Sequence, residues 1–376
     1  MRIFKIISIN LIIFIATIEL GSYILTKANL FLINEKPKLY NLDGNKLKDI
    51  EFGRTEKEAW GTWHKPNNTF RQSKSCFDIE MSFNEVGARD KSFIDISQNT
   101  IILLGDSFAE GYGVSYEQMV QTLIEQKIGI NIANLGSANN FGPLQELIIY
   151  KNFKKIPHSG LIIFILPAND FTDNDSLVWS KINKSRYRPY FNETGDSLIP
   201  FYFPEAKKVD QLINTKFDKI KKFIKNNFWL SNALRSILLL FFDQTSDVKF
   251  SFYYDITDLK QQLNLAKAYK EIINQAEDKD VLFVIIPSEI DILRHREENF
   301  SKKYKNKIWY KEIQNLTNKK TQKISILDLL DFVEDDYKKL FFKCDSHWSP
   351  YGNKWASNKI TDKIIKEDLF SKIKDN

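Results

Sequence analysis

The chain has 376 residues, of which 43% are hydrophobic and 14% aromatic, so it can form a large folded core and is not globally disordered. This length allows one large α/β domain with additions, or two domains. The net charge is +6, but acidic and basic residues are interspersed without a basic stripe. The charge therefore gives no support for nucleic-acid binding and only weak support for contact with acidic lipid or glycan.

The N-terminal segment predicts a membrane anchor over residues 1–28. Arg2 and Lys5 precede an apolar run, 6–25, that is about as long as a membrane-spanning helix, although Glu19 interrupts it near its outer end. Positive charge before the run favours an N-terminus inside the cell. We therefore expect a single span in the inner or plasma membrane, with the rest of the chain periplasmic or extracellular. A cleaved signal peptide is the alternative, but no convincing small-residue cleavage site follows.

Residues 29–98 predict a β-rich lead-in that packs on the main domain. Long helical periodicity is missing there, and the sequence after residue 77 alternates as a strand does. Arg89 follows a turn, and we expect it to form a surface ion pair with a nearby aspartate. The two cysteines, Cys76 and Cys344, lie far apart and lack the spacing of metal ligands. They form either one disulfide, in an oxidising compartment, or two unpaired buried thiols.

The remaining residues, 99–376, alternate between strand and helix signals. The strand candidates are 100–105, 131–135, 161–166, 281–286 and 324–328. The helix candidates are 116–128, 142–155, 258–277, 303–319 and 351–373. Strands that alternate with helices imply crossover connections and a parallel sheet. We therefore predict an α/β fold, a three-layer α/β/α sandwich around a five-stranded parallel sheet with right-handed crossovers.

One long insertion, 171–257, separates the third and fourth predicted strands. Its second part, 209–242, has helical periodicity and contains the very apolar stretch Leu238–Phe242. That stretch is too short to span a membrane, so it packs either on the core or on a membrane surface. The first part is rich in aromatic residues, which either belong to the core or stack on sugar rings: Trp179, Tyr187, Tyr190 and Tyr202.

Polar residues gather just after the predicted strands, at the edge where parallel sheets bind ligands. They are found at 105–107, 134–137, 167–170 and 344–348. A serine nucleophile needs a base, and His347 is the only histidine in such a loop with a carboxylate beside it. Asp345 is close enough in sequence to hold the imidazole. These residues predict acyl transfer, with Ser107 as nucleophile, His347 as base and Asp345 as the orienting carboxylate.

The same loops offer donors for a developing oxyanion. The backbone N–H groups of Ser107 and Gly136 and the side-chain amide of Asn169 would supply three. Glycine at position 136 lets the backbone approach a substrate closely. The other histidines lie outside these loops and carry no comparable signal: His64, His158 and His295.

In this order, the residues resemble the SGNH, or GDSL-type, hydrolase superfamily. Its four blocks correspond to Gly-Asp-Ser at 105–107, to Gly136, to Asn169 with Asp170, and to an Asp–His block at 345–347. The sequence departs from the family pattern in two ways: Pro167 replaces a glycine, and Cys344 stands where the more usual aspartate would be. The Asp-x-His-Trp form is similar to that of membrane-anchored SGNH-like proteins associated with polysaccharide acetylation.

The resemblance implies strand order 2-1-3-4-5, no metal, no nucleotide cofactor, and an acyl-enzyme formed on Ser107. Three functions stay open. The first is an esterase that removes O-acyl groups, acetyl above all, from an extracytoplasmic glycan or lipid. The second is an O-acetyltransferase that works with partner acetylation machinery on an envelope polysaccharide. The third is a non-catalytic glycan-binding protein, against which the intact Ser107, Asn169 and His347 argue.

Overall fold

A computed structural model describes residues 2–28, 54–58, 60–74, 76–94, 96, 99–138, 142–178, 189–191, 228–230, 233–234, 253–297, 303–318 and 322–371. The first part of the lead-in and most of the insertion lie outside these ranges. The sequence-based interpretations of Trp179, Tyr187, Tyr202 and Leu238–Phe242 therefore concern residues that are not described. Tyr190 is described and is buried, with 2% of its surface exposed.

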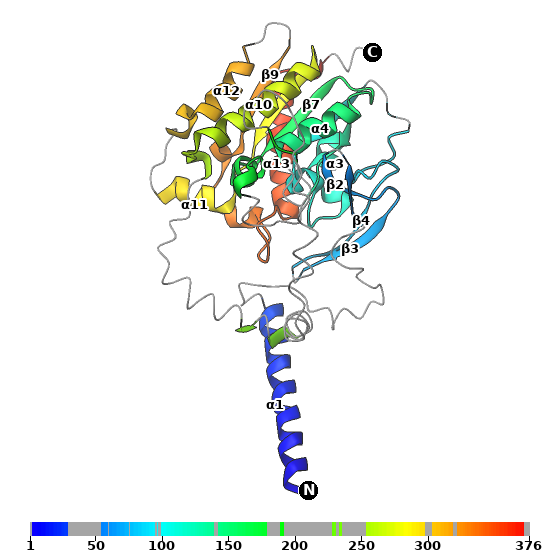
Figure 1. Ribbon diagram of the computed structural model, residues 1–376, viewed down its shortest axis with the longest axis vertical. Coiled ribbons are helices and arrows are strands. Elements are labelled where there is room, and N and C mark those ends of the chain that lie inside the picture. Colours follow the sequence, from blue (N-terminus) through cyan, green and yellow to red (C-terminus); the bar gives the residue numbers. More distant parts are fainter. Residues whose placement is uncertain are drawn as a thin grey trace.

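A five-stranded, all-parallel sheet forms the centre of the main domain (Figure 1). Its spatial order, β6-β5-β7-β8-β9, confirms the expected order 2-1-3-4-5. Strands β5, β7 and β8 are buried along their whole length, which explains why they form uninterrupted apolar runs in the sequence. The strands are β5 (Thr100–Leu104), β6 (Asn131–Asn134), β7 (Gly160–Ile165), β8 (Asp280–Ile285) and β9 (Ile324–Asp328).

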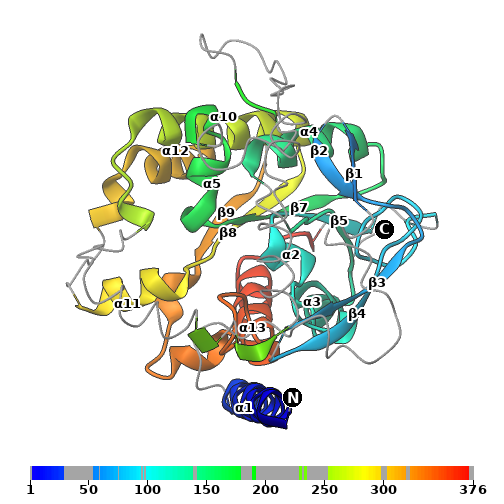
Figure 2. The ribbon, with the colours of Figure 1, turned by 60° about the horizontal axis from the view of Figure 1, so that its bottom comes forward.

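Helices cover both faces of this sheet, which confirms the three-layer α/β/α prediction (Figure 2). One layer contains α4 (Pro143–Phe153), α10 (Leu259–Ala276) and α12 (Ile308–Leu316). The other contains α3 (Val120–Ile128) and α13 (Pro350–Lys366). The buried residues of α10 recur at helical spacing, because one face of an amphipathic helix packs on the core: Leu265, Tyr269, Ile272, Ile273 and Ala276.

Two short helices stand directly after strands, where the sequence predicts only loops: α2 (Ser107–Glu110) and α5 (Pro167–Asp173). Helix α11 (Glu289–Glu297) follows β8 and contains His295, in agreement with the charged helix that the sequence indicates around this residue. Helix α2 begins because Asp106 Oδ1 accepts the N–H of Phe108 at 2.9 Å, and α5 begins with a proline, which suits a first helical position. Segments this short give no reliable periodicity in a sequence. They turn the polar residues after β5 and β7 into helix starts at one edge of the sheet.

The lead-in forms two antiparallel hairpins beside the main domain (Figure 2). Strands β1 (Arg54–Glu58) and β2 (Gly61–His64) form one, and β3 (Thr69–Ser73) and β4 (Asp78–Ser82) form the other.

The expected surface ion pair of Arg89 is wrong. Its side chain is 2% exposed and donates to the carbonyl oxygens of Glu110, Gly111 and Val114. Burial lowers the pKa of Arg89 to about 10, so the guanidinium remains charged at neutral pH. A buried guanidinium with five donors can satisfy several carbonyl groups at once, which a sequence pattern does not reveal.

Helix α1 (Arg2–Lys27) extends away from the main domain (Figure 1). Its segment Phe4–Leu25 has 22 residues and a mean hydropathy of 1.9, which is long and apolar enough to cross a membrane. A signal sequence has the same properties, so both sequence-based alternatives stay open. Glu19 is buried here, and its carboxylate accepts the backbone N–H groups of Trp229, at 2.5 Å, and Leu230, at 2.9 Å.

Candidate active site

Ser107 is the first residue of α2 and follows the end of β5 by a tight turn. Gly105 makes that turn possible, because its φ of +152° is rarely adopted by other residues. A Cβ atom on Gly105 would lie 2.8 Å from the Phe164 Cβ and 2.9 Å from the Ala109 Cβ. The turn leaves Ser107 half-buried at the carboxyl edge of the sheet, between neighbours that are buried.

His347 reaches Ser107 from the loop before α13. The distance from Ser107 Oγ to His347 Nε2 is 2.7 Å, a hydrogen bond across 240 positions of sequence. A β-bridge between Phe341 and Trp348 closes this loop, and the buried Trp348 ring packs on Phe108 with their centroids 4.9 Å apart. The tryptophan thus fastens the loop to α2 and holds the imidazole over the serine.

Asp345 holds the imidazole from its other side. One oxygen, Oδ1, contacts His347 Nδ1 and also accepts the backbone N–H of His347 at 2.9 Å. The loop turns back on itself, since the Phe342 N–H donates to the His347 carbonyl at 3.0 Å. This turn explains why a spacing of only two residues is long enough. With its Nδ1 proton directed at Asp345, the imidazole presents Nε2 as an acceptor for the serine proton.

The charge on Asp345 is stabilised within a buried environment. Its side chain is 6% exposed. Burial alone would raise the pKa of Asp345, but the hydrogen bond and charge of His347, together with Lys74, hold it well below its usual range. The Lys74 Nζ contacts Oδ2, the carboxylate oxygen that His347 does not use. Asp345 is therefore a carboxylate at every pH where the imidazole can act as a base.

The expected oxyanion donors lie together at the strand ends, but two of them have partners. The Gly136 N–H donates to Asn134 Oδ1 at 2.8 Å, and Asn169 Nδ2 donates to Asp106 Oδ2 at 3.3 Å. The Ser107 N–H is at the first helical position, where helix N–H groups have no intrahelical acceptor. Oxyanion stabilisation by these three groups therefore stays a prediction, and for two of them it requires a change of partner.

Gly136 has a packing role that the sequence does not indicate. A Cβ atom at this position would lie 2.5 Å from the Ala109 Cβ and 2.7 Å from the Glu110 nitrogen. Any other residue at position 136 would therefore force α2 or the loop after β6 to move. The glycine therefore allows the loop after β6 to pack directly against the helix that carries Ser107.

Three buried carboxyl groups belong to the segments around Ser107. Burial raises the pKa of Asp106, Glu146 and Asp170. Acidic neighbours raise the pKa of Glu146 and Asp170 further, whereas hydrogen bonds and the charge of His347 oppose the rise at Asp106. The Leu166 N–H donates to Asp170 at 2.7 Å, which ties this group to the start of α5. Among the residues that the structure describes, no three His, Cys, Asp or Glu side chains are arranged to hold a metal ion.

Three residues near His347 and Asp345 are not predicted from the sequence, and a disulfide there is predicted only as one of two alternatives. Tyr112 stacks on the His347 ring at 4.2 Å, and Phe108 lies 5.1 Å from it on a tilted plane. Lys74 comes from the β3–β4 hairpin, 271 positions from its partner Asp345. The structure also joins Cys76 to Cys344 in a disulfide next to Asp345, which is one of the two alternatives left open above. No local pattern marks Lys74, because its partner is so distant in sequence.

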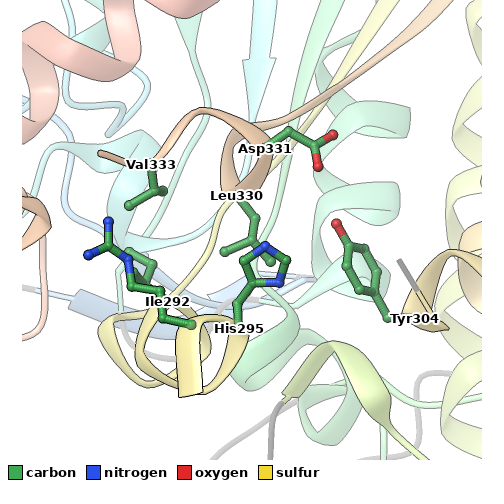
Figure 3. A pocket seen from close by; sticks show the side chains of 7 residues that line it. Ile292, His295, Tyr304, Leu330, Asp331 and Val333 are labelled. Atoms are coloured by element: carbon green, nitrogen blue, oxygen red, sulfur yellow. The ribbon is translucent and has the colours of Figure 1, made fainter. Parts of the chain in front are cut away.

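A separate cavity of about 270 Å³ lies where the segments after β8 and β9 meet (Figure 3). Neither Ser107 nor His347 lines it, so it is not the reaction site. His295, which carries no catalytic signal in the sequence, belongs to this cavity. Side chains from α11, from the turn before α12 and from the segment after β9 converge there: Ile292, His295, Arg296, Tyr304, Leu330, Asp331 and Val333.

Comparisons with known proteins give only remote likenesses. No protein-family model matches the chain, and none of the curated proteins compared with it matches. Among solved structures, a member of the lipolytic protein G-D-S-L family from Veillonella parvula is 13% identical with a TM-score of 0.37, covering 70% of this chain and 96% of that one. A lipase/acylhydrolase from Enterococcus faecalis is also 13% identical, with a TM-score of 0.36, covering 71% and 95%.

A family two carbohydrate esterase from Clostridium thermocellum, in complex with cellohexaose, is 10% identical with a TM-score of 0.36, covering 73% of this chain and 65% of that one. Likenesses at these scores and identities carry no argument about activity. The inference of function therefore depends on the geometry around Ser107.

Proposed function

We propose that the chain is a serine esterase that removes O-acyl groups, acetyl above all, from an extracytoplasmic glycan or lipid. One observation carries this proposal: Ser107 Oγ lies 2.7 Å from His347 Nε2, while His347 Nδ1 contacts Asp345. A nucleophile, its base and an orienting carboxylate in contact are what acyl transfer to a serine requires. The apolar helix α1 supports attachment to a membrane, near such substrates.

The first half of the reaction transfers the acyl group to the enzyme. Ser107 Oγ attacks the acyl carbonyl carbon while its proton passes to His347 Nε2. The tetrahedral intermediate then releases the substrate oxygen, which takes the proton from Nε2. Asp345 stabilises the imidazolium formed between these two steps, because its carboxylate stays charged. The acyl group is left as an ester on Ser107.

The second half removes the acyl group from Ser107. A water molecule gives a proton to His347 Nε2 and attacks the ester carbonyl carbon. When the bond from this carbon to Ser107 Oγ breaks, Nε2 returns the proton to Oγ, which releases the free acid and restores the serine. If a sugar hydroxyl attacks instead of water, the same residues make the chain an O-acetyltransferase that modifies an envelope polysaccharide. This second candidate uses an identical catalytic group, so only the acceptor distinguishes it. It would also need partner machinery that supplies the acyl donor.

The test is hydrolysis of a short-chain aryl acetate by the full chain in detergent. We expect wild type to release acetate, and Ser107→Ala and His347→Ala to lower kcat/KM by about a thousandfold or more. Ser137→Ala is the matched control, since this serine is buried after the neighbouring strand and is not in contact with a histidine in the described structure. Equal, slow hydrolysis by wild type and both site variants contradicts the proposal.

Two further measurements sharpen the assignment. An oligosaccharide acceptor added to the assay separates the two candidates: acetylated sugar detected by mass spectrometry identifies the transferase, and free acetate alone identifies the esterase. Asn169→Ala should lower kcat about a hundredfold if its amide stabilises the oxyanion. An unchanged kcat would mean that the amide serves only to hold Asp106.

A further inference from the structure

The lead-in contributes a charged group to the interior of the site. Lys74 follows β3, and its Nζ contacts Asp345 Oδ2. The opposite oxygen, Oδ1, is occupied by the backbone N–H and the imidazole of His347. Each carboxylate oxygen therefore has its own partner, and the carboxylate plane is fixed from two sides. Lys74 also lies over the Tyr112 ring, with 5.6 Å between Nζ and the centroid, and Tyr112 stacks on His347.

The β3–β4 hairpin is fastened to the catalytic loops at several points. The Gly113 N–H donates to Gln72 Oε1 at 3.0 Å, which joins β3 to the segment after α2. The Phe77 ring packs at 5.0 Å from Phe342 and at 5.8 Å from Tyr112. The Cys76–Cys344 disulfide adds a covalent link two positions beyond Lys74 and one before Asp345. Lys74 is held in place by this attachment rather than by the sheet.

An ammonium group at this position has a specific electrostatic effect. A carboxylate that is 6% exposed loses most of its hydration, and a lysine ammonium in contact with it restores part of the lost stabilisation. The lysine side chain itself is 27% exposed, so the contact is partly screened by solvent. The positive charge of the ammonium partly offsets the negative charge of Asp345, so the carboxylate attracts a proton on the imidazole more strongly when the ammonium is removed. This favours the protonated form, which cannot accept the serine proton.

We propose that Lys74 is a positioning residue of the active site, which fixes the Asp345 carboxylate and limits its effect on the His347 imidazole. The inference rests on the proposed function. The lead-in is then part of the site, because it adds Lys74 as a fourth, positively charged member to the group of Ser107, His347 and Asp345.

The test measures kcat, KM and the pH dependence of kcat/KM for Lys74→Met in the full chain. We expect kcat to fall about tenfold to a hundredfold with KM almost unchanged, since the carboxylate loses its fixed orientation. We also expect the acid limb of the profile to move to higher pH, because the imidazole holds its proton longer. Lys74→Arg should recover most of both effects. Lys91→Met is the matched control, since Lys91 is a mostly exposed lead-in lysine 3.7 Å from Glu125.

Two outcomes overturn the inference. One is a Lys74→Met variant with wild-type kcat and a wild-type acid limb. The other is a loss of kcat that is equal at all pH values and is not recovered by Lys74→Arg, as a purely structural role predicts. If wild type itself has no esterase activity, the proposed function fails and the inference is tested by NMR. In that case the His347 titration, assigned with His347→Ala, should have its midpoint at higher pH in Lys74→Met than in wild type. An unmoved midpoint overturns it.

Discussion

Two histidine–carboxylate pairs contact the same short helix, α2, and they differ in what surrounds them. His64 Nε2 contacts Glu110 Oε1, and both side chains are 1% exposed. The His64 ring is stacked on Phe83, with the centroids 3.8 Å apart. In the other pair His347 is 20% exposed, and its second ring nitrogen reaches Ser107. A histidine beside a carboxylate is therefore not by itself a catalytic pair. The solvent exposure of the histidine and the partner of its second ring nitrogen distinguish the two pairs.

The two pairs also differ in how they are built. His64 belongs to the lead-in strand β2, and Glu110 is the last residue of α2, so this pair joins two parts of the fold. Asp345 and His347 lie in one loop, which the Trp348 ring holds to α2 and β7 and which Cys344 links to the lead-in. We infer that the first pair holds the lead-in on the helix that carries the nucleophile, and that the second performs the chemistry on it. The predictions below test this division.

Separate substitution of the two histidines should give the largest difference between an effect on activity and an effect on stability. His347→Ala should lower kcat/KM by about a thousandfold or more, because the base that accepts the serine proton is lost. His64→Phe should keep most of the activity per folded molecule but lower the free energy of unfolding by about 1–3 kcal/mol, since the buried Glu110 side chain loses its contact with His64. Aryl acetate hydrolysis and chemical denaturation in detergent measure the two effects. A His64→Phe protein that is stable but inactive would refute the division of roles.

Substitution of the two carboxylates, Asp345 and Glu110, should show the same difference between a catalytic and a structural role. Asp345→Asn should lower kcat by about a hundredfold to ten-thousandfold, because the amide no longer selects the imidazole tautomer that accepts the serine proton. Glu110→Gln should change kcat by less than about tenfold and act mainly on stability. The ratio of kcat values, measured on samples with equal folded fractions, makes the comparison. If Asp345→Asn retains wild-type kcat, another group must orient His347.

Much of the catalytic group could be predicted because it lies at strand ends. Apolar runs mark β5, β7 and β8 in the sequence, and the residues after them must share one edge of a parallel sheet. Ser107 and His347 follow from that rule and from the need of a serine for a base. The positions of α2 and α5 do not follow, since helices of four and seven residues are too short for a periodic signal.

The lead-in contacts could not be predicted for a different reason. Arg89, Lys74 and His64 act through partners that lie 21 to 271 positions away, so nothing near them in sequence shows what they bind. A buried arginine has the same local pattern as an exposed one. The partner of the Asn169 amide, Asp106, likewise lies 63 positions away. Only tertiary structure specifies such contacts.

Loss of the disulfide should affect the catalytic pair and leave the buried pair in place. The Cys76–Cys344 link closes a loop of 268 positions, and its removal in a Cys76→Ser/Cys344→Ser double variant should cost about 2–5 kcal/mol of unfolding free energy. We expect kcat to fall as well, because the hairpin that carries Lys74 is less firmly held to Asp345. Hydrogen exchange should rise near 342–347 more than near His64. Reactive thiols in the unreduced wild-type protein would contradict the disulfide itself.

The smallest expected effect is the change of unfolding free energy with pH that comes from the Asp345 carboxyl. The pKa of this carboxyl is lowered in the folded state, so its ionisation stabilises the fold at every pH above the unfolded value of about 4. That contribution is lost only as the pH falls below this value towards the folded pKa. The difference in unfolding free energy between wild type and Asp345→Asn should therefore shrink as the pH falls below about 4.

Lys74 provides the control for this measurement, since its ammonium is one of the groups that lower the Asp345 pKa. In a Lys74→Met background the same difference should be smaller at neutral pH, and its loss should begin near the same pH but be complete at a higher pH, because the folded pKa lies closer to the unfolded one. The order of these causes matters: burial opposes the ionised carboxylate, and His347 and Lys74 together overcome that opposition. If the Asp345→Asn difference is the same in both backgrounds, His347 alone keeps Asp345 charged. The catalytic pair would then need no more help from the lead-in than the His64–Glu110 pair does.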